Sequence, residues 1–248
     1  MELAQFFQEN PKAALAFSGG VDSAYLLYAA GQLGADVQAY YVKSAFQPRF
    51  ELEDAKRLSR QLSVRLRILE TDVLADSIIV DNPGDRCYYC KKKIFAAIAQ
   101  AAAEDGYRVL LDGTNASDEE GDRPGMRALK ELEVRSPLRE CGLTKEDVRR
   151  LSKEAGLFTW NKPAYACLAT RIPAGEPITR EKLQATEAAE DYLFSLGFTD
   201  FRVRRMQDAA RLQVPSGQLE KVLLKRKEIL TELKRYYGAV LLDLEGRE

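Results

Sequence analysis

The spacing of apolar residues along the first part of the chain predicts strands and helices in alternation. Short apolar runs typical of buried strands lie at residues 13–16, 36–42, 64–69 and 107–111. Longer segments with apolar residues at helical spacing lie between or after them, at residues 24–33, 50–62 and 86–104. This order predicts an α/β domain with a doubly wound parallel sheet, whose ligands bind at the carboxyl ends of the strands.

The pattern changes near residue 160. Thr144 with Asp147 forms a capping-box signature for a helix that runs to about residue 155, and the Pro-containing stretch 160–177 then has no regular period. Beyond it, a helix at 179–196, strands at 201–206 and 210–214, a helix at 218–237 and a strand at 239–244 predict a smaller α+β domain. We therefore expect a first domain over residues 1–160, a linker loop over 161–177 that carries Cys167, and a second domain over 178–248.

Composition narrows the class of protein. The 248 residues include 37 Lys and Arg against 38 Asp and Glu, so there is no net positive field to attract a nucleic acid. The amino terminus has no basic segment followed by an apolar core, and no stretch reaches the roughly 18 apolar residues of a membrane span. We expect a cytoplasmic protein with neither a nucleic-acid nor a membrane partner. Because the chain has no histidine, metal binding and acid–base chemistry must rest on sulfur and carboxylate groups.

Residues 17–23 read F-S-G-G-V-D-S, between the first predicted strand and the first predicted helix. Two adjacent glycines allow a tight turn that directs backbone N–H groups inward, which predicts an anion cradle rather than a turn without a ligand. A Walker A loop has a lysine where this chain has Asp22, and S-G-G-x-D-S instead resembles the PP-loop of the ATP pyrophosphatases. Asp22 is a candidate Mg²⁺ ligand, with helix capping as the alternative. The predicted ATP-binding residues are those of the loop and two that follow neighbouring strands, namely Ser18, Gly19, Gly20, Asp22, Ser23, Ser44 and Gly113.

Four cysteines are the other candidate chemical groups. Cys87 and Cys90 lie one turn apart at the start of the predicted helix 86–104, where the helix dipole favours thiolate. Cys167 lies in the linker loop, and Cys141 precedes the helix that begins at Thr144. A single C-x-x-C leaves a structural zinc site, a redox disulfide and an iron–sulfur cluster open, and we expect Cys141 to be an ordinary cysteine.

Several motifs together resemble the LarE-type sulfur transferases over nearly the whole chain. They are A-F-S-G-G-V-D-S at 16–23, C-Y-Y-C-K-K at 87–92, L-D-G-T-N at 111–115 with D-R-P-G at 122–125, the Cys167 loop, and F-R-V-R at 201–204. The resemblance implies an enzyme that uses ATP and Mg²⁺ to adenylylate a carboxylate of pyridinium-3,5-dicarboxylate mononucleotide and then replaces that oxygen with sulfur. The product would mature into the nickel-pincer nucleotide cofactor of lactate racemase.

The resemblance also implies roles for residues of the substrate site. Lys91, Arg202 and Arg204 match positions that grip the substrate phosphate, a task that suits guanidinium groups. Glu190 matches a polar substrate-binding position. The sequence leaves open that Lys91 and Glu190 are solvated surface residues, and that Arg202 and Arg204, which alternate with Phe201 and Val203, lie on a solvated strand face.

The resemblance offers two sources of sulfur. Members with a cysteine only at the position of Cys167 give up its sulfur and are left with dehydroalanine. This chain resembles members that hold a [4Fe-4S] cluster on three cysteines, here Cys87, Cys90 and Cys167, and deliver sulfide from the open iron of the cluster. A sulfide donor is then an expected partner. Asp22 and Cys167 are then the expected catalytic residues, and we expect a homo-oligomer. Ala174 departs from the family pattern, because an aromatic residue commonly follows Arg-Ile-Pro there.

Two other functions fit parts of the sequence. Another PP-loop enzyme, such as an amide-forming ATP pyrophosphatase or a tRNA thiolase, would need an ammonia source or a basic RNA-binding surface. A non-catalytic carrier would bind nucleotide and sulfide, or a cluster, without releasing pyrophosphate.

Overall fold

The computed structural model describes residues 1–118 and 124–247 and divides into two compact units. The first consists of Met1–Val73 and Asp85–Lys162, and the second of Leu74–Gly84 and Pro163–Glu248. Each unit has its own sheet and its own apolar core. The chain therefore enters the second unit briefly and returns to the first just before the segment that carries Cys87 and Cys90.

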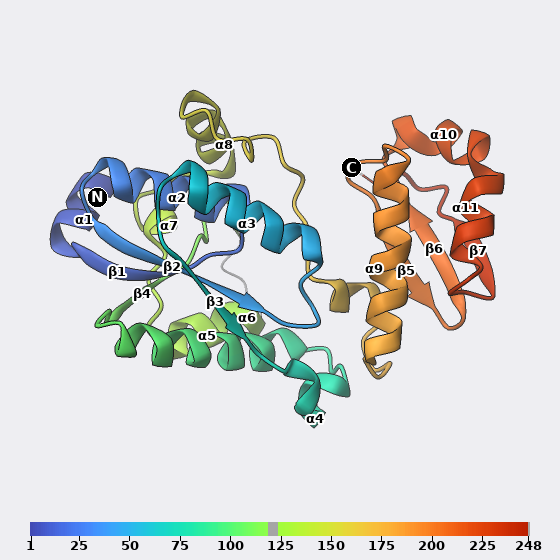
Figure 1. The fold of residues 1–248 in the computed structure, drawn as a ribbon, viewed down its shortest axis with the longest axis horizontal. Coiled ribbons are helices and arrows are strands. Elements are labelled where there is room, and N and C mark those ends of the chain that lie inside the picture. Colours follow the sequence, from blue (N-terminus) through green and yellow to red (C-terminus); the bar gives the residue numbers. More distant parts are fainter. Residues whose placement is uncertain (119–123, 248) are drawn as a thin grey trace. The chain divides into compact units, whose positions relative to one another are not determined.

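The first unit is a four-stranded parallel sheet with helices on both faces, as Figure 1 shows. The doubly wound parallel sheet predicted from the sequence is confirmed. Its strands lie in the order β3-β2-β1-β4 and are β1 (Lys12–Ala16), β2 (Asp36–Lys43), β3 (Leu66–Glu70) and β4 (Val109–Leu111). Its described helices are α1 (Leu3–Glu9), α2 (Val21–Gln32), α3 (Arg49–Gln61), α5 (Arg86–Glu104), α6 (Pro124–Glu131), α7 (Pro137–Glu140) and α8 (Lys145–Glu154).

Alternate strand residues face opposite helical layers, so this unit has two cores. Leu15 and Tyr41 belong to the core formed with α1, α2 and α3. Ala14 and Tyr40 belong to the core that includes Ile98 of α5. A strand buried on both faces must be apolar at nearly every position, and the continuous apolar runs that predict these strands have this composition.

The second unit combines a three-stranded sheet with helices. Strand β5 (Arg202–Met206) runs antiparallel to β6 (Ala209–Gln213), which runs parallel to β7 (Ala239–Leu242). The paired residues Val203 and Leu212 are buried in a core with residues of the helices. The opposite face of the same strand pair carries Arg204 across from Arg211. The helices are α4 (Ser77–Val80), α9 (Arg180–Ser195), α10 (Leu219–Leu224) and α11 (Arg226–Leu233), with short 3-10 helices η2 (Leu168–Arg171) and η3 (Ser216–Gln218), and η1 (Val73–Ala75) at the unit boundary.

One predicted helix is wrong in the second unit. The sequence predicts a single helix over 218–237, but the chain forms α10 and α11 with a break at Lys225. Leu223 and Leu224 are 56% and 83% exposed, so the apolar run that suggested one continuous helix does not face the core throughout. The buried residues of this segment are instead divided between the two short helices.

The segment Leu74–Gly84 belongs to the second unit through specific hydrogen bonds. The side-chain amide of Asn82 donates to the carbonyl oxygens of Pro173 at 2.8 Å and Glu176 at 3.2 Å. The backbone N–H of Ile178 donates to the carbonyl of Val80 at 2.8 Å. No local pattern in the sequence indicates this association, because the partners are about 90 residues apart.

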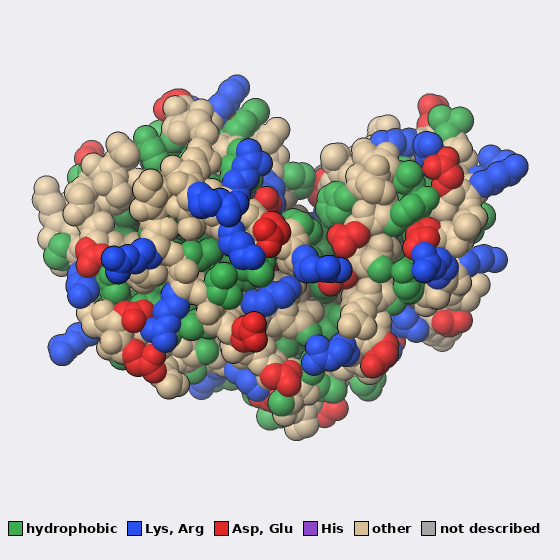
Figure 2. All heavy atoms as spheres, viewed as in Figure 1, with side chains coloured by type: hydrophobic (Ala, Val, Ile, Leu, Met, Phe, Trp, Pro, Cys, Tyr) green, Lys and Arg blue, Asp and Glu red, His purple; other side chains and the backbone are tan. Residues whose placement is uncertain are grey.

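Two observations bear on the membrane and charge predictions. No described helix is long and apolar enough to cross a bilayer. On the face drawn in Figure 2, Lys and Arg side chains are interspersed with Asp and Glu side chains.

Candidate active site

The loop between β1 and α2 is folded by its own serines and glycines. The hydroxyls of Ser18 and Ser23 lie 3.1 Å apart, and the backbone N–H of Gly20 donates to the Ser18 hydroxyl at 3.3 Å. Gly19 has a φ of +71°, a conformation that side chains disfavour. Helix α2 begins at Val21 with Gly20 as a cap that provides no side-chain hydrogen bond. The N–H groups of the first turn are therefore available to an anion.

Two glycines are required because the loop is packed against its neighbours. A Cβ atom at Gly19 would lie 3.2 Å from the backbone N of Ala55 and the carbonyl O of Glu51 in α3. A Cβ atom at Gly113, which follows β4 by two residues, would lie 2.8 Å from the backbone N of Ser23. The ends of two adjacent parallel strands thus meet at the start of α2. A close approach of backbone to backbone, without side chains, is what a phosphate cradle requires.

Asp22 lies in the first turn of α2 but does not cap it, so the capping alternative is wrong. Its carboxylate accepts a hydrogen bond from the side-chain amide of Asn115 at 3.2 Å and forms an ion pair with Lys145 at 2.5 Å. Asn115 is 2% exposed. The carboxylate is therefore fixed from two sides at the mouth of the loop, where it could contribute to a Mg²⁺ site.

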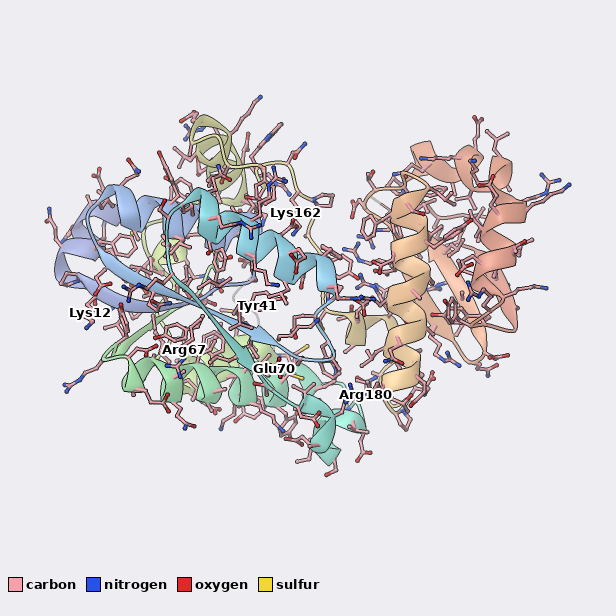
Figure 3. All side chains as sticks on the ribbon, viewed as in Figure 1. Lys12, Tyr41, Arg67, Glu70, Lys162 and Arg180 are labelled. Atoms are coloured by element: carbon pink, nitrogen blue, oxygen red, sulfur yellow. The ribbon has the colours of Figure 1, made fainter. Side chains whose placement is uncertain are left out.

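Two lysines that the sequence prediction missed lie at this loop. Lys145 is the first residue of α8, and Lys162 lies beyond its end. The Lys162 ammonium is 2.6 Å from Asp54 of α3 and 3.5 Å from the carbonyl O of Gly19. Figure 3 shows Lys162 near helix α3. The signal available in the sequence was the capping box, which predicts where α8 begins but not which loop it faces.

The loop after β4 is held by Asp112. This buried carboxylate accepts hydrogen bonds from the Ser136 hydroxyl at 2.7 Å and from the backbone N–H of Thr114 at 3.2 Å. These bonds fix the chain on either side of Gly113. Asp122 and Arg123 of the D-R-P-G motif lie outside the described residues.

Ser44 follows β2 at the same edge of the sheet and is buried. Its hydroxyl donates to Oε1 of Gln47 at 2.6 Å and accepts from the backbone N–H of Phe46 at 3.2 Å. The side chain thus organises its own loop. Its contact with ATP stays a prediction.

Cys87 and Cys90 lie in the first turns of α5 and differ in their surroundings. Cys87 is exposed, whereas Cys90 is buried and accepts a hydrogen bond from Nη1 of Arg86 at 3.5 Å. Arg86 is itself buried, and its guanidinium lies over the ring of Phe46. The Cys90 thiol therefore lies beside a buried positive charge.

Lys91 is partly buried, so the solvated-surface interpretation is wrong for this residue. A Cβ atom at Gly125 would lie 3.2 Å from its Cε, which shows that α6 packs directly on the lysine stem. Burial lowers the pKa of Lys91, although Asp112 and Cys87 act in the opposite direction. Its ammonium therefore lies in a partly desolvated position where a phosphate would be held strongly.

In the second unit, Cys167 directly precedes η2 and is partly exposed. Its carbonyl accepts hydrogen bonds from the backbone N–H of Thr170 at 3.0 Å and from the Thr170 hydroxyl at 2.8 Å. Arg171, the last residue of η2, is 1% exposed and close enough to Cys167 for their charges to interact.

Glu190 is buried rather than exposed, which corrects the surface interpretation. It is 1% exposed and forms a two-point ion pair with Arg171, with Nε–Oε1 at 2.7 Å and Nη2–Oε2 at 3.3 Å. It also accepts from the backbone N–H of Val203 at 2.9 Å and from the Tyr165 hydroxyl. Burial by itself would lower the pKa of Arg171, but Glu190 raises it. Glu190 therefore links the Cys167 loop, helix α9 and strand β5.

Arg202 and Arg204 lie beside this pair, and Arg202 is 6% exposed, so the solvated-face interpretation is wrong for it. Burial, with the charges of Arg171 and Arg247, lowers the pKa of Arg202 to about 10. Burial and the charge of Arg171 also lower the pKa of Arg204, which donates to Gln213 at 2.6 Å and to the Thr170 carbonyl at 2.9 Å. Asp200 lies 3.7 Å from Arg202 but is shared with Arg247, so positive charge still exceeds negative charge here, and a bound anion would relieve it.

The cysteines are thiols in the described structure, with no disulfide among them. Burial raises the pKa of Cys141, which favours its neutral thiol. Cys87 and Cys90 belong to the first unit and Cys167 to the second. Over residues 1–118 and 124–247, no group of three or more Cys, Asp or Glu side chains is arranged to hold a metal ion.

The chain is similar in sequence to several known proteins. The family of the queuosine biosynthesis protein QueC matches residues 12–82. An uncharacterized protein of Synechocystis sp. is 38% identical over 98% of this chain and 92% of its own length. The pyridinium-3,5-bisthiocarboxylic acid mononucleotide synthase of Lactiplantibacillus plantarum is 36% identical over 98% of this chain and 90% of its own length. The tRNA-specific 2-thiouridylase MnmA 2 of Clostridium botulinum is 26% identical over 60% of this chain and 51% of its own length.

Proposed function

The chain belongs to the LarE-type family of ATP-dependent sulfur transferases, and on that premise we propose that its substrate is pyridinium-3,5-dicarboxylate mononucleotide. ATP activates a carboxylate of this substrate, and sulfur then replaces the activated oxygen. The product enters nickel-pincer nucleotide biosynthesis. The observation that carries this proposal is the loop Ser18–Ser23, which forms a backbone cradle for phosphate but has Asp22 in place of the lysine of a Walker A loop.

Activation is needed because oxide is a very poor leaving group from a carboxylate. In the first step a carboxylate oxygen attacks the α-phosphorus of ATP, and the bond to the pyrophosphate breaks. In the second step sulfide attacks the acyl carbon, and AMP leaves with the former carboxylate oxygen. The loop and the uncapped start of α2 stabilise the pyrophosphate as negative charge develops on it.

The arginines of the second unit are suited to the phosphate of the mononucleotide. Arg202 and Arg204 are partly desolvated, and their pKa values are lowered by burial and by neighbouring guanidiniums. A phosphate dianion offers both groups charge-assisted hydrogen bonds and reduces their mutual repulsion. Glu190 keeps Arg171 neutralised and fixes β5, so we assign it to positioning the arginines.

The residues available for sulfur chemistry fit a cluster in part. Cys87, Cys90 and Cys167 would hold a [4Fe-4S] cluster, which would supply the sulfide when it is bound. Arg86 places a buried positive charge beside Cys90, one of these proposed ligands. In the alternative, Cys167 itself provides the sulfur. We also propose that a separate sulfide donor supplies the sulfur. The protein would be cytoplasmic and would form a homo-oligomer.

The test is incubation of anaerobically purified protein with ATP, Mg²⁺, sulfide and the dicarboxylate mononucleotide. We expect AMP and pyrophosphate in amounts that depend on the mononucleotide, together with a thiocarboxylate product. ADP and phosphate would contradict the proposal. Intact-mass spectrometry after turnover then distinguishes the sulfur sources, because loss of the elements of hydrogen sulfide from Cys167 indicates sacrifice of that residue.

A second candidate is suggested by the similarity to the tRNA-specific 2-thiouridylase. Such an enzyme would activate a base of tRNA through the same loop. The 37 basic and 38 acidic residues do not provide the net positive charge that favours RNA. Transfer of labelled sulfur to tRNA, in the absence of the mononucleotide, would favour this candidate.

A further inference from the structure

The ion pair between Lys145 and Asp22 brings an ammonium group to the nucleotide loop from a distant part of the chain. The two residues are 123 positions apart, and Nζ lies 2.5 Å from Oδ2. The side chains are 33% and 22% exposed, so the pair is accessible from solvent. Asp22 stands where a Walker A loop has its lysine, and Lys145 therefore lies next to the position of that missing cation.

The backbone of Lys145 is fixed independently of this ion pair. Thr144 and Asp147 form the capping box at the start of α8, with the Asp147 N–H donating to the Thr144 hydroxyl at 3.2 Å. The backbone N–H of Lys145 donates to the Ser117 hydroxyl at 2.9 Å, which ties α8 to the loop that carries Asn115. The lysine thus extends from a constrained helix start, and its side chain can exchange partners without movement of the backbone.

Lys162 is a useful contrast because it serves the loop in another way. Its ammonium lies between Asp54 and the carbonyl of Gly19, and over the ring of Phe50. Its side chain is 18% exposed, against 33% for Lys145. Both lysines pair with a carboxylate, but Lys162 also contacts the loop backbone and is more buried, whereas Lys145 is more open to solvent.

We propose that Lys145 binds the pyrophosphate portion of ATP and takes the place of the lysine that the loop lacks. The inference rests on the proposed use of ATP by this loop. Without nucleotide, Asp22 holds the ammonium in place. When polyphosphate binds, oxygen atoms of the β- and γ-phosphates compete with Asp22 for the three N–H groups of Lys145.

This role concerns the first chemical step. The carboxylate oxygen of the substrate forms a bond to the α-phosphorus, and the bond between that phosphorus and the bridging oxygen breaks. The electron pair stays on pyrophosphate, where Lys145 stabilises the added negative charge while retaining its own proton. AMP, by contrast, has no group at the position that the lysine would contact.

Calorimetric titration with two probes tests this assignment. We expect Lys145→Met to weaken binding of inorganic pyrophosphate and of α,β-methylene-ATP by about 10-fold or more, because a charge-assisted contact is lost. Binding of AMP should change less than about twofold, and Lys145→Arg should restore part of the affinity. Lys153→Met is the matched control, because Lys153 lies at the other end of α8, with its ammonium over the ring of Trp160.

Two results obtained with Lys145→Met would overturn the assignment. One is unchanged affinity for both polyphosphate probes in Lys145→Met, and the other is an equal loss for AMP, which would indicate a structural defect. Absence of polyphosphate binding by the unchanged protein also contradicts it. Formation of AMP and pyrophosphate by the unchanged protein is measured separately, so the role of Lys145 can fail while the proposed function stands.

Discussion

The two units carry candidate anion sites that are built differently. In the first, the cradle is made of backbone N–H groups, two serine hydroxyls and glycines packed against neighbouring backbone. In the second, the candidate site is made of side-chain charges, with Arg171 paired with Glu190, Arg202 3.7 Å from Asp200, and Arg204 bonded to the neutral Gln213 and Thr170 carbonyl. The first site should therefore be sensitive to added volume and the second to a lost charge.

Removing the buried carboxylate of the second unit should have the largest effect. We expect Glu190→Gln to lower the free energy of unfolding by about 3–5 kcal/mol, because Arg171 would be left buried without its counter-charge. Urea denaturation measures this change. Glu232→Gln is the control, since Glu232 pairs with Arg235 on the surface and its loss should cost at most about 1 kcal/mol. Equal effects of the two changes would show that Arg171 finds another partner.

Adding one carbon to the first site should have the next largest effect, here on enzymatic activity. We expect Gly113→Ala to reduce formation of AMP by about 100-fold, because its Cβ would displace the backbone N of Ser23, 2.8 Å away. Gly31→Ala is the control, since Gly31 lies in α2, the helix that contains Ser23, and a Cβ atom at Gly31 would meet nothing within 4 Å. Normal activity of Gly113→Ala would mean that the loop is not a close-packed cradle.

Removing the charge of Arg204 should weaken binding of the mononucleotide without changing the affinity for ATP. We expect Arg204→Met to weaken binding of the dicarboxylate mononucleotide by about 10- to 100-fold, with ATP affinity unchanged. Arg235→Met, on the surface of the same unit, provides the control. An unaltered titration curve for the mononucleotide would identify Arg204 as a structural residue that holds Gln213 and the Thr170 carbonyl.

The smallest effect should come from removing the ammonium of Lys162, which contacts the backbone of the first loop. We expect Lys162→Met to cost about 1 kcal/mol of stability and to raise the KM for ATP a few-fold, since the partly buried pair with Asp54 is lost. Thermal unfolding and initial rates measure the two quantities. Lys56→Met removes an exposed pair with Glu53 of the same helix α3 and should change neither. A loss of ATP binding as large as that expected for Gly113→Ala would make Lys162 a direct ligand.

Local signals account for what the sequence predicted well. Helix α5 has the predicted bounds, Arg86–Glu104, and the capping box of Thr144 and Asp147 is present. The glycine loop has its expected strand-turn-helix setting because its conformation depends on neighbouring residues.

Features that depend on long-range contacts could not be predicted in this way. Lys145 contacts Asp22, which is 123 positions away in the sequence. Arg171 and Glu190 form a buried ion pair, and no local pattern in the sequence indicates that either side chain is buried. The break at Lys225 reflects tertiary packing of α10 and α11, which the apolar run of the segment does not encode.

The fate of the carboxylate oxygen tests the central claim most directly. The mononucleotide can be labelled with ¹⁸O in its carboxylates and incubated with ATP, Mg²⁺ and sulfide under anaerobic conditions. The account predicts one ¹⁸O atom in the AMP released for each thiocarboxylate formed, because AMP departs with the oxygen that sulfur replaces. AMP without ¹⁸O, or ¹⁸O in phosphate beside ADP, would contradict activation of the carboxylate by adenylylation.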